Sequence, residues 1–417
     1  MEDVKVNKGT VISAIFLVAG CCVGGGMLAL PVSTALIGFI PSVGVMLLCW
    51  AAMTGSALLL LEVNLWFEKG AHIITMSSRL LGRWAQGLCW LLYLFVCYGS
   101  LIAYTSGGSL QVMAFVNKVF GIAISRGMGS FIYAFIFFGL IYFGSKIVGR
   151  VNSILFVAMI VTYFALLGIG VPEMDTELYK FHQWHGVGLS IPVLLTSFSF
   201  QTMLPSLTPY LKRNVKALRL SIIAGTLIAL VIYLAWQGFF FGIVPAWGSE
   251  GLINAMQKGQ PPIDVLVDAL QSRKTAMIAQ YFAFFAIATC FIAIAMGLFD
   301  FLSDGLKIKE KGKGKFFLWI LMLVPTLLIA TKFERAFLVA METSGGIGDS
   351  ILNGMIPIAM VWVGRYRLKM TGVYRMMGGK VVLVGLFAFY LSVFIIEMLV
   401  ITGVVAPDYQ LSRTVDF

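Results

Sequence analysis

Eleven long apolar segments divide the chain, and they limit its possible folds more than any other feature. An α-helix needs roughly 20 apolar residues to cross a bilayer, and most of these segments reach that length. Hydrophobic residues make up 59% and charged residues 12% of the chain, whereas a soluble domain has roughly 25% charge. The sequence therefore predicts an all-α polytopic membrane protein. Its expected spans cover residues 10–39, 42–67, 86–115, 128–145, 151–171, 188–210, 218–244, 275–303, 316–331, 336–364 and 380–403.

Lys and Arg are distributed unevenly among the loops. With a cytoplasmic N-terminus, most of the 30 basic residues fall in cytoplasmic segments, including the run LKIKEKGKGK between the eighth and ninth spans. Because cytoplasmic loops keep positive charge, this bias predicts that the N-terminus is inside. An odd number of spans then places the C-terminal tail, residues 404–417, outside. The net charge of +11 is explained by topology, and no nucleic-acid partner is expected.

The first and sixth spans contain residues that break helices at mid-depth. The first carries Gly24, Gly25 and Gly26, and Pro31 follows. The sixth contains TSFSFQTMLPSLTPYL, in which polar residues precede two prolines. Glycine costs about 1 kcal/mol and proline about 3 kcal/mol in a helix interior. Irregular backbone at membrane depth is tolerated only where protein or water satisfies it, so both breaks need an explanation.

The spacing of the two breaks predicts an inverted repeat. They lie five spans apart, and a unit with an odd number of spans inserts in opposite orientations. We therefore expect repeats over residues 10–171 and 188–364 and an added helix at 380–403, all within one transport domain over residues 1–403. One break alone would fit close helix packing or a kink. Two matched breaks favour a transporter's substrate site.

An interrupted helix also suggests the chemistry of its ligand. One half-helix begins with free N–H groups that attract a carboxylate, and the other ends with free carbonyls that attract an ammonium group or a cation. An α-amino acid carries both charges on adjacent atoms. The paired breaks therefore predict an amino acid as the small-molecule substrate.

Four stretches resemble the bacterial aromatic amino acid permeases, the tyrosine- and tryptophan-specific members of the hydroxy and aromatic amino acid permease family. They are GGGMLALP, LLLLEVNLWF, SFSFQTMLPSLTPYLKRNVKALR and MGLFDFLSDGLK. The resemblance implies a LeuT-like 5+5 inverted repeat of the amino acid–polyamine–cation superfamily, with an eleventh helix. It also implies proton-coupled import of an aromatic amino acid, tyrosine first, at the bacterial inner membrane. Permeases of this family often have FGFH in the sixth span, whereas this chain has FSFQ, so Gln201 stands in place of a titratable histidine.

The resemblance implies a set of substrate-binding residues. The carboxylate should meet backbone N–H groups at the glycines of the first span, and the ammonium group should meet carbonyls of both broken spans. Polar side chains of the sixth span and aromatic rings around it should hold the rest of the substrate. The expected residues are Cys21, Cys22, Gly24, Gly25, Gly26, Met27, Tyr98, Tyr104, Ser197, Phe198, Ser199, Phe200, Gln201 and Thr202.

Proton coupling requires an ionisable group within the membrane, where carboxylates are few. Glu62 in the second span is the first candidate, and Asp300 and Glu342 follow. The structural alternative for Glu62 is an ion pair with an arginine of the inner face. Sodium coupling also stays open, because Thr289 and carbonyls of the first span could form an oxygen cage. No cofactor and no metal site are expected, since the proton motive force would supply the energy.

A membrane-bound enzyme would carry a catalytic motif within its spans, and the sequence contains none of the motifs expected of one. It has neither H-E-x-x-H nor G-x-S-x-G, and no histidine lies at mid-span. Alternatives within transporters are a tryptophan permease, a serine/threonine permease and a sodium-coupled amino acid carrier. We expect the protein to be a monomer. Besides the amino acid substrate, its expected partner is membrane lipid.

Overall fold

The computed structural model describes residues 6–68, 71–143, 145–248, 251–258, 260, 262–270, 272–309, 311–332 and 336–405. Of the predicted outer tail at 404–417, residues 406–417 lie outside these ranges. The described chain is built from helices, with one isolated antiparallel bridge between Gly38 and His182.

The predicted spans correspond to helices in the same order. Nine helices of the described chain are long and apolar enough to cross a membrane, and one bent pair forms a tenth span. The shorter apolar helix α6 stands where the fourth span was predicted. The spans are α1 (Lys8–Cys22) with α2 (Gly25–Ser33), α3 (Phe39–Trp66), α5 (Arg83–Phe120), α6 (Arg126–Tyr142), α7 (Ser145–Gly170), α8 (Val187–Ser197) with α9 (Leu204–Tyr210), α10 (Val215–Phe241), α13 (Arg273–Leu306), α14 (Gly312–Ala330), α15 (Ala336–Thr343) with α16 (Ile356–Trp362), and α17 (Gly379–Ile401).

Two of these spans are interrupted, as the sequence predicts. α1 and α2 form the bent pair, with an angle of 49° between them. In the sixth span, α8 ends at Ser197, and a short turn η3 (Gln201–Met203) precedes α9. A third irregularity was not predicted: the tenth span contains two π-helices, η4 (Ser344–Met355) and η5 (Val363–Arg367). Such i→i+5 segments are rare and frequently mark functional sites.

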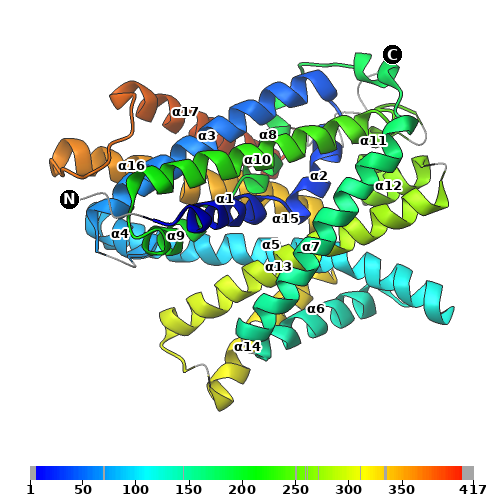
Figure 1. Ribbon diagram of the computed structural model, residues 1–417, viewed down its shortest axis with the longest axis horizontal. Helices are drawn as coiled ribbons and strands as arrows, with labels where there is room; N and C mark the ends of the chain where they lie inside the picture. The colour runs from blue at the N-terminus through cyan, green and yellow to red at the C-terminus, as the bar shows by residue number, and fades with distance from the viewer. Residues whose placement is uncertain are drawn as a thin grey trace.

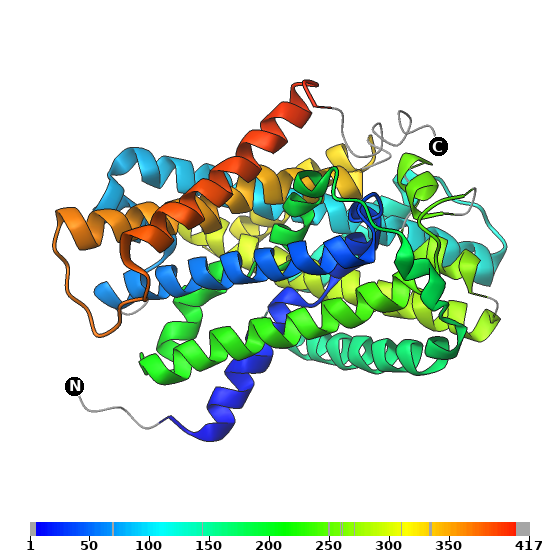
Figure 2. The same ribbon diagram turned by 90° about the horizontal axis from the view of Figure 1, so that it is seen from above.

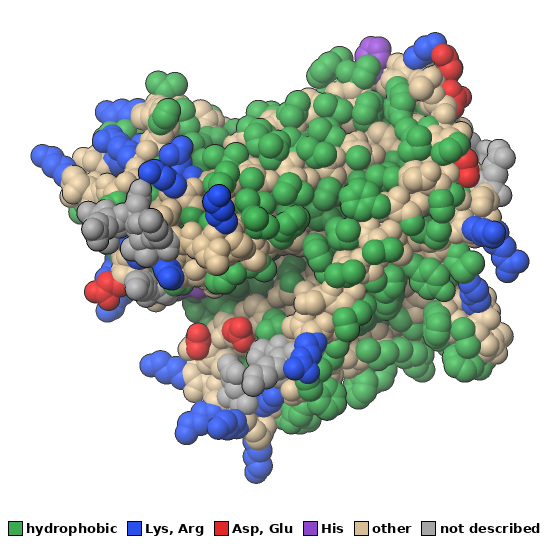
Figure 3. Space-filling view, in the orientation of Figure 1, with side chains coloured by type: hydrophobic (Ala, Val, Ile, Leu, Met, Phe, Trp, Pro, Cys, Tyr) green, Lys and Arg blue, Asp and Glu red, His purple; other side chains and the backbone are tan. Residues whose placement is uncertain are grey.

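The helices form two groups around the long helix α5. Figure 1 shows α1, α3 and α10 running together, with α6, α13 and α14 below them. α1 packs against α10, and α13 packs against both α7 and α5. Figure 2 shows α17 crossing one side of the molecule, where few of its residues are buried. In Figure 3 apolar side chains cover the middle of the visible face and charged side chains gather toward its ends, as expected for a membrane-spanning body.

Short helices cover the ends of the spans. The amphipathic helix α4 (Ile73–Leu81) buries one face against α5. Helices α11 (Leu252–Lys258) and α12 (Pro262–Ala269) pack on α2. A hydrogen bond holds the turn after α2 in place: the backbone N–H of Gln183 donates to the Ile37 carbonyl over 2.9 Å. Gly38 in this turn has a φ of +77°, and a Cβ atom there would lie 2.3 Å from the Phe181 carbonyl oxygen, so glycine is required.

Candidate functional site

The two helix breaks meet at a single point inside the molecule. α1 ends at Cys22 and α8 ends at Ser197, and each leaves carbonyl groups without helical partners. The hydroxyl oxygen of Tyr233, on α10, lies 2.5 Å from the Cys22 carbonyl oxygen and 2.7 Å from that of Ser197. Since a hydroxyl has one proton, it donates to one carbonyl at a time. Both carbonyls belong to the broken spans, where the resemblance implies contacts with the substrate's ammonium group.

Tyr233 was not predicted as a site residue. It is one of 14 tyrosines and sits in an unbroken apolar span, so nothing in its neighbourhood marks it. It is fully buried, and its ring lies 5.0 Å from that of Phe198, measured between centroids. The structure thus places the predicted Phe198 beside both breaks.

The three glycines of the first break allow close contacts with other helices. A Cβ atom on Gly24 would lie 2.0 Å from the Cys290 sulfur, and one on Gly25 would lie 2.5 Å from a Tyr104 ring carbon. A Cβ atom on Gly26 would lie 3.2 Å from the Ser197 hydroxyl. The predicted Tyr104 therefore does lie at the break. In this structure, side chains of other helices occupy the space beside the backbone that the glycines leave free.

Two of the predicted carboxylate donors have partners within the protein. The Gly25 N–H donates to the Cys290 sulfur over 3.3 Å, and the Met27 N–H donates to the Gly24 carbonyl over 3.1 Å. The predicted carboxylate contact would therefore compete with bonds that already exist.

The second break is held by its own side chains. The Gln201 Oε1 atom accepts from the Phe200 N–H over 2.9 Å, and its Nε2 atom donates to the Met53 carbonyl on α3 over 3.1 Å. Gln201 is fully buried and Phe200 nearly so, while Thr202 is half-buried. Gln201 thus links the break to α3 through hydrogen bonds between uncharged groups.

A buried acid lies beside the second break, and it was not predicted. The Ser199 hydroxyl, between α8 and η3, donates to the Asp349 Oδ1 atom over 2.7 Å. The Asn353 Nδ2 atom donates to the same oxygen over 2.6 Å. Asp349 lies seven residues after the predicted Glu342, in the run METSGGIGDS.

Other predicted residues lie away from the breaks. The Tyr98 hydroxyl donates to the Leu321 carbonyl on α14 over 2.8 Å. Asp300 is exposed on α13, and Glu342 is half-buried on α15. Their assigned roles stay predictions.

Glu62 is held in a buried ion pair. Arg365 donates from Nε to Oε1 over 2.7 Å and from Nη2 to Oε2, and the Met376 N–H donates to Oε2 over 2.8 Å. Both charged side chains are almost completely buried. This geometry is the structural alternative named above, an ion pair with an arginine, and the coupling role of Glu62 stays a prediction.

One side of the first break is open, and the other is covered. All nine residues of α2 are buried, whereas Cys21, next to the end of α1, is exposed. Tyr93 on α5 lies within electrostatic range of both Cys21 and the exposed Asp300. Figure 3 shows this face hollowed between α1 and the helices α13 and α14.

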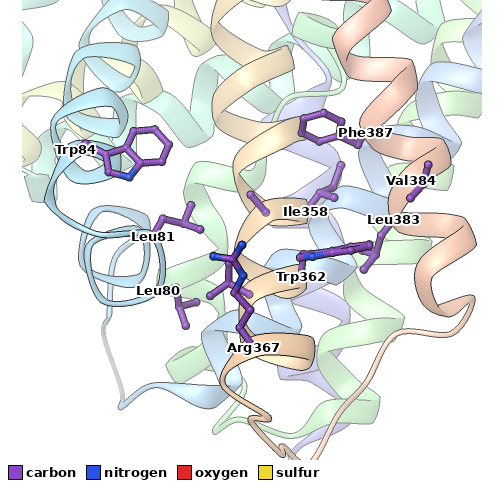
Figure 4. Close-up of a pocket in the computed structure, with 11 residues that line it drawn as sticks. Leu80, Leu81, Trp84, Ile358, Trp362, Arg367, Leu383, Val384 and Phe387 are labelled. Carbon is purple, nitrogen blue, oxygen red and sulfur yellow. The ribbon is translucent and has the colours of Figure 1, made fainter.

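A separate cavity lies where α4, α5, α16, η5 and α17 meet. Its volume is about 530 Å³, and Figure 4 shows the rings of Trp84, Trp362 and Phe387 around it with Arg367. None of the predicted substrate residues lines it. Over the described residues, no group of three His, Cys, Asp or Glu side chains converges as metal ligands.

Comparison with known proteins gives consistent matches along the chain. The tryptophan-specific transport protein of Haemophilus influenzae is 28% identical over 389 residues, which cover 90% of this chain and 93% of that protein. The tyrosine-specific transport system 1 of Haemophilus influenzae is 28% identical over 385 residues, covering 89% and 92%. The low affinity tryptophan permease of Escherichia coli K12 is 26% identical and covers 92% and 94%.

A solved structure supports the architecture. The crystal structure of MhsT in complex with L-phenylalanine matches with a TM-score of 0.64 at 14% identity, covering 96% of this chain and 99% of that chain. The likeness shows a LeuT-like membrane fold. The sequence profile of the tryptophan/tyrosine permease family matches residues 7–397. The chain is accordingly a transport protein and not an enzyme, and it belongs to the tryptophan/tyrosine permease family.

Proposed function

We propose that this chain is a secondary transporter that imports an aromatic amino acid across the bacterial inner membrane by alternating access. The observation that carries the proposal is the convergence of the Cys22 and Ser197 carbonyls beside the rings of Phe198 and Tyr104. Carbonyl ends suit an ammonium group, and aromatic rings suit an aromatic side chain. The named substrates of the relatives, tryptophan and tyrosine, support the same class.

Tyrosine is the first candidate substrate and tryptophan the second. A serine/threonine permease is a weaker rival because the aromatic rings of Tyr104 and Phe198 lie at the breaks. We further propose that the transporter is a monomer, with the N-terminus in the cytoplasm and the C-terminus outside. Protons drive uptake in this scheme, with sodium as the rival ion.

Counterflow in proteoliposomes tests the substrate. Vesicles preloaded with unlabelled tyrosine should accumulate labelled tyrosine from outside, and competition by all 20 amino acids should rank tyrosine and tryptophan highest. Empty vesicles without protein are the control. A chain that exchanges serine and threonine but neither aromatic amino acid would contradict the proposal.

Imposed gradients test the coupling ion. With an acidic exterior and no sodium, the vesicles should accumulate tyrosine above the outside concentration. A proton ionophore should abolish that accumulation but leave counterflow intact, since exchange needs no driving force. Accumulation driven by sodium and not by protons would overturn this part of the proposal.

A further inference from the structure

Asp349 is bonded directly to the helix break of the sixth span. Its Oδ1 atom accepts from Ser199, which is one of the non-helical residues that follow α8, and from Asn353. The Asn353 amide nitrogen also lies 3.0 Å from the Ser199 hydroxyl oxygen. The three side chains form a triangle, the Asp349 cluster, that joins the π-helix η4 to the interrupted backbone.

The cluster is buried, and two of its oxygens have no hydrogen-bond partner. Asp349 and Asn353 are both fully buried. The Oδ2 atom of Asp349 and the Oδ1 atom of Asn353 lie unpaired in the interior. Burying an unpaired polar atom is unfavourable, because the atom loses its hydrogen bonds to water. A proton on Oδ2 would remove the negative charge and would supply a donor where only acceptors now face the interior.

The surroundings of Asp349 offer no positive charge. Over the described residues, no Lys, Arg or His lies within ion-pair distance of its carboxylate, in contrast to Glu62 with its arginine. An isolated carboxylate inside a membrane protein is costly, and such residues mark ion and proton pathways.

The titratable groups near Asp349 on the neighbouring helices are neutral when protonated, while the basic Arg83, Lys118 and Lys380 stand in the end turns of α5 and α17. α5 contributes Cys97 and Tyr104, and α17 contributes Tyr390 and the carboxyl of Glu397, which lies against Gly346 of η4. The other titratable groups on packed elements are Glu342 on α15 and Cys49 and Glu62 on α3, while α8 and α16 contribute none.

We propose that Asp349 is the residue that binds the coupling proton, and that Ser199 conveys its charge state to the substrate site. This inference rests on the proposed function. As a carboxylate, Asp349 holds Ser199 and Asn353 through charge-assisted hydrogen bonds, which are roughly twice as strong as neutral ones. A proton arriving from outside binds Oδ2, weakens these two bonds and frees the break to rearrange around the substrate. The proton leaves to the inside with the substrate.

The test separates exchange from accumulation. Asp349→Asn resembles the protonated acid in size and in carrying both a donor and an acceptor, but it cannot titrate. It should keep tyrosine counterflow within about twofold of the unsubstituted chain and should lose accumulation driven by a pH gradient. Proton uptake accompanying tyrosine, followed by a pH-sensitive dye in the vesicle lumen, should fall to the level of empty vesicles.

Two controls use other acids of the membrane interior. Glu397→Gln removes a second buried carboxyl near η4 and should keep proton-driven accumulation. Glu62→Gln should lower protein yield through the broken ion pair, while the folded fraction should still couple to protons. Accumulation by Asp349→Asn equal to that of the unsubstituted chain would overturn the inference.

Milder variants cover the case in which Asp349→Asn does not fold. Asp349→Glu stays titratable, and Ser199→Ala removes the positioning contact but not the acid. Both should shift the pH at which counterflow is half-maximal, and Ser199→Thr, which restores a hydroxyl, should return it. An unchanged pH profile in both variants would overturn the inference. If the unsubstituted chain exchanges no aromatic amino acid, the proposed function itself fails. If it accumulates tyrosine with sodium alone, only the proton site is refuted.

Discussion

The three glycines of the first break have different neighbours, so their substitutions should have different costs. Gly24 faces the Cys290 sulfur, Gly25 faces the Tyr104 ring and Gly26 faces Ser197. The sequence indicated that the backbone must be approached closely here, but it could not say by what. The contacts come from helices that are distant in sequence, and the composition of the first span contains no information about them.

Gly25→Ala should disrupt the site far more than Gly26→Ala. The new methyl group at residue 25 would lie 2.5 Å from a Tyr104 ring carbon, whereas at residue 26 the nearest atom is 3.2 Å away. Overpacking of a buried site typically costs about 1–3 kcal/mol. Tyrosine counterflow and melting temperature in detergent should both fall for Gly25→Ala.

A second substitution shows whether the Tyr104 ring is responsible. Tyr104→Leu removes the clashing ring atoms, so adding it to Gly25→Ala should restore the melting temperature of the single variant. If the single variant melts and transports like the unsubstituted chain, the close contact described here is wrong.

At the scale of helices, span positions were well predicted, while local helix type was not. The third predicted span, 86–115, lies within α5 (Arg83–Phe120), because hydropathy reports where the membrane is. The π-helix η4 was missed because an i→i+5 pattern leaves no periodic signal in twelve residues. Asp349 lies within η4 and was not among the predicted coupling residues, whereas the predicted Glu342 lies on α15.

The covering helix α12 contains an acid whose charge is disfavoured. Burial, with a smaller contribution from Asp268, raises the pKa of Asp264 to about 6 from an ordinary value of 3.8. As the pH rises, this carboxyl loses its proton at a lower pH in the unfolded chain than in the folded chain. Asp264 therefore destabilises the folded state fully above about pH 6, and this penalty disappears below about pH 4.

Asp264→Asn should stabilise the protein at neutral pH and leave it unchanged in acid. The expected gain at pH 7.5 is on the order of 1–2 kcal/mol, allowing for the partial exposure of the side chain. Thermal unfolding in detergent at pH 7.5 and pH 4 measures it. Asp268→Asn, at an exposed neighbour, is the matched control and should give a smaller gain. An equal gain for Asp264→Asn at both pH values would contradict this explanation.

At the scale of the whole molecule, the described conformation is closed on the side of α2 and open on the side of α1. The sequence predicted two breaks and their partnership, because both depend on local composition and on the order of the spans. It could not predict which side is covered. That depends on how α11, α12 and the segment around Phe181 fold over α2, and these segments have no periodic pattern strong enough to place them.

Cysteine labelling tests this asymmetry. Cys21 is exposed, whereas Cys22, Cys49, Cys89 and Cys97 are buried. A membrane-impermeant maleimide should modify the chain when it is applied to the side on which α1 begins and should not when it is applied to the other side. Cys21→Ser should abolish most of this labelling. Equal labelling from the other side would mean that the open side has been assigned wrongly.

The position of Tyr233 has a consequence for the speed of substrate capture. Its hydroxyl contacts both carbonyls that an incoming ammonium group would need, so the hydroxyl must move before the substrate can be held. An ammonium group has three protons and can donate to both carbonyls at once, so the exchange is favourable once it begins. The observed binding rate should therefore rise with substrate concentration and then level off at the rate at which the hydroxyl departs. At high substrate concentration, the rate of substrate capture would be set by the movement of the Tyr233 side chain and not by diffusion.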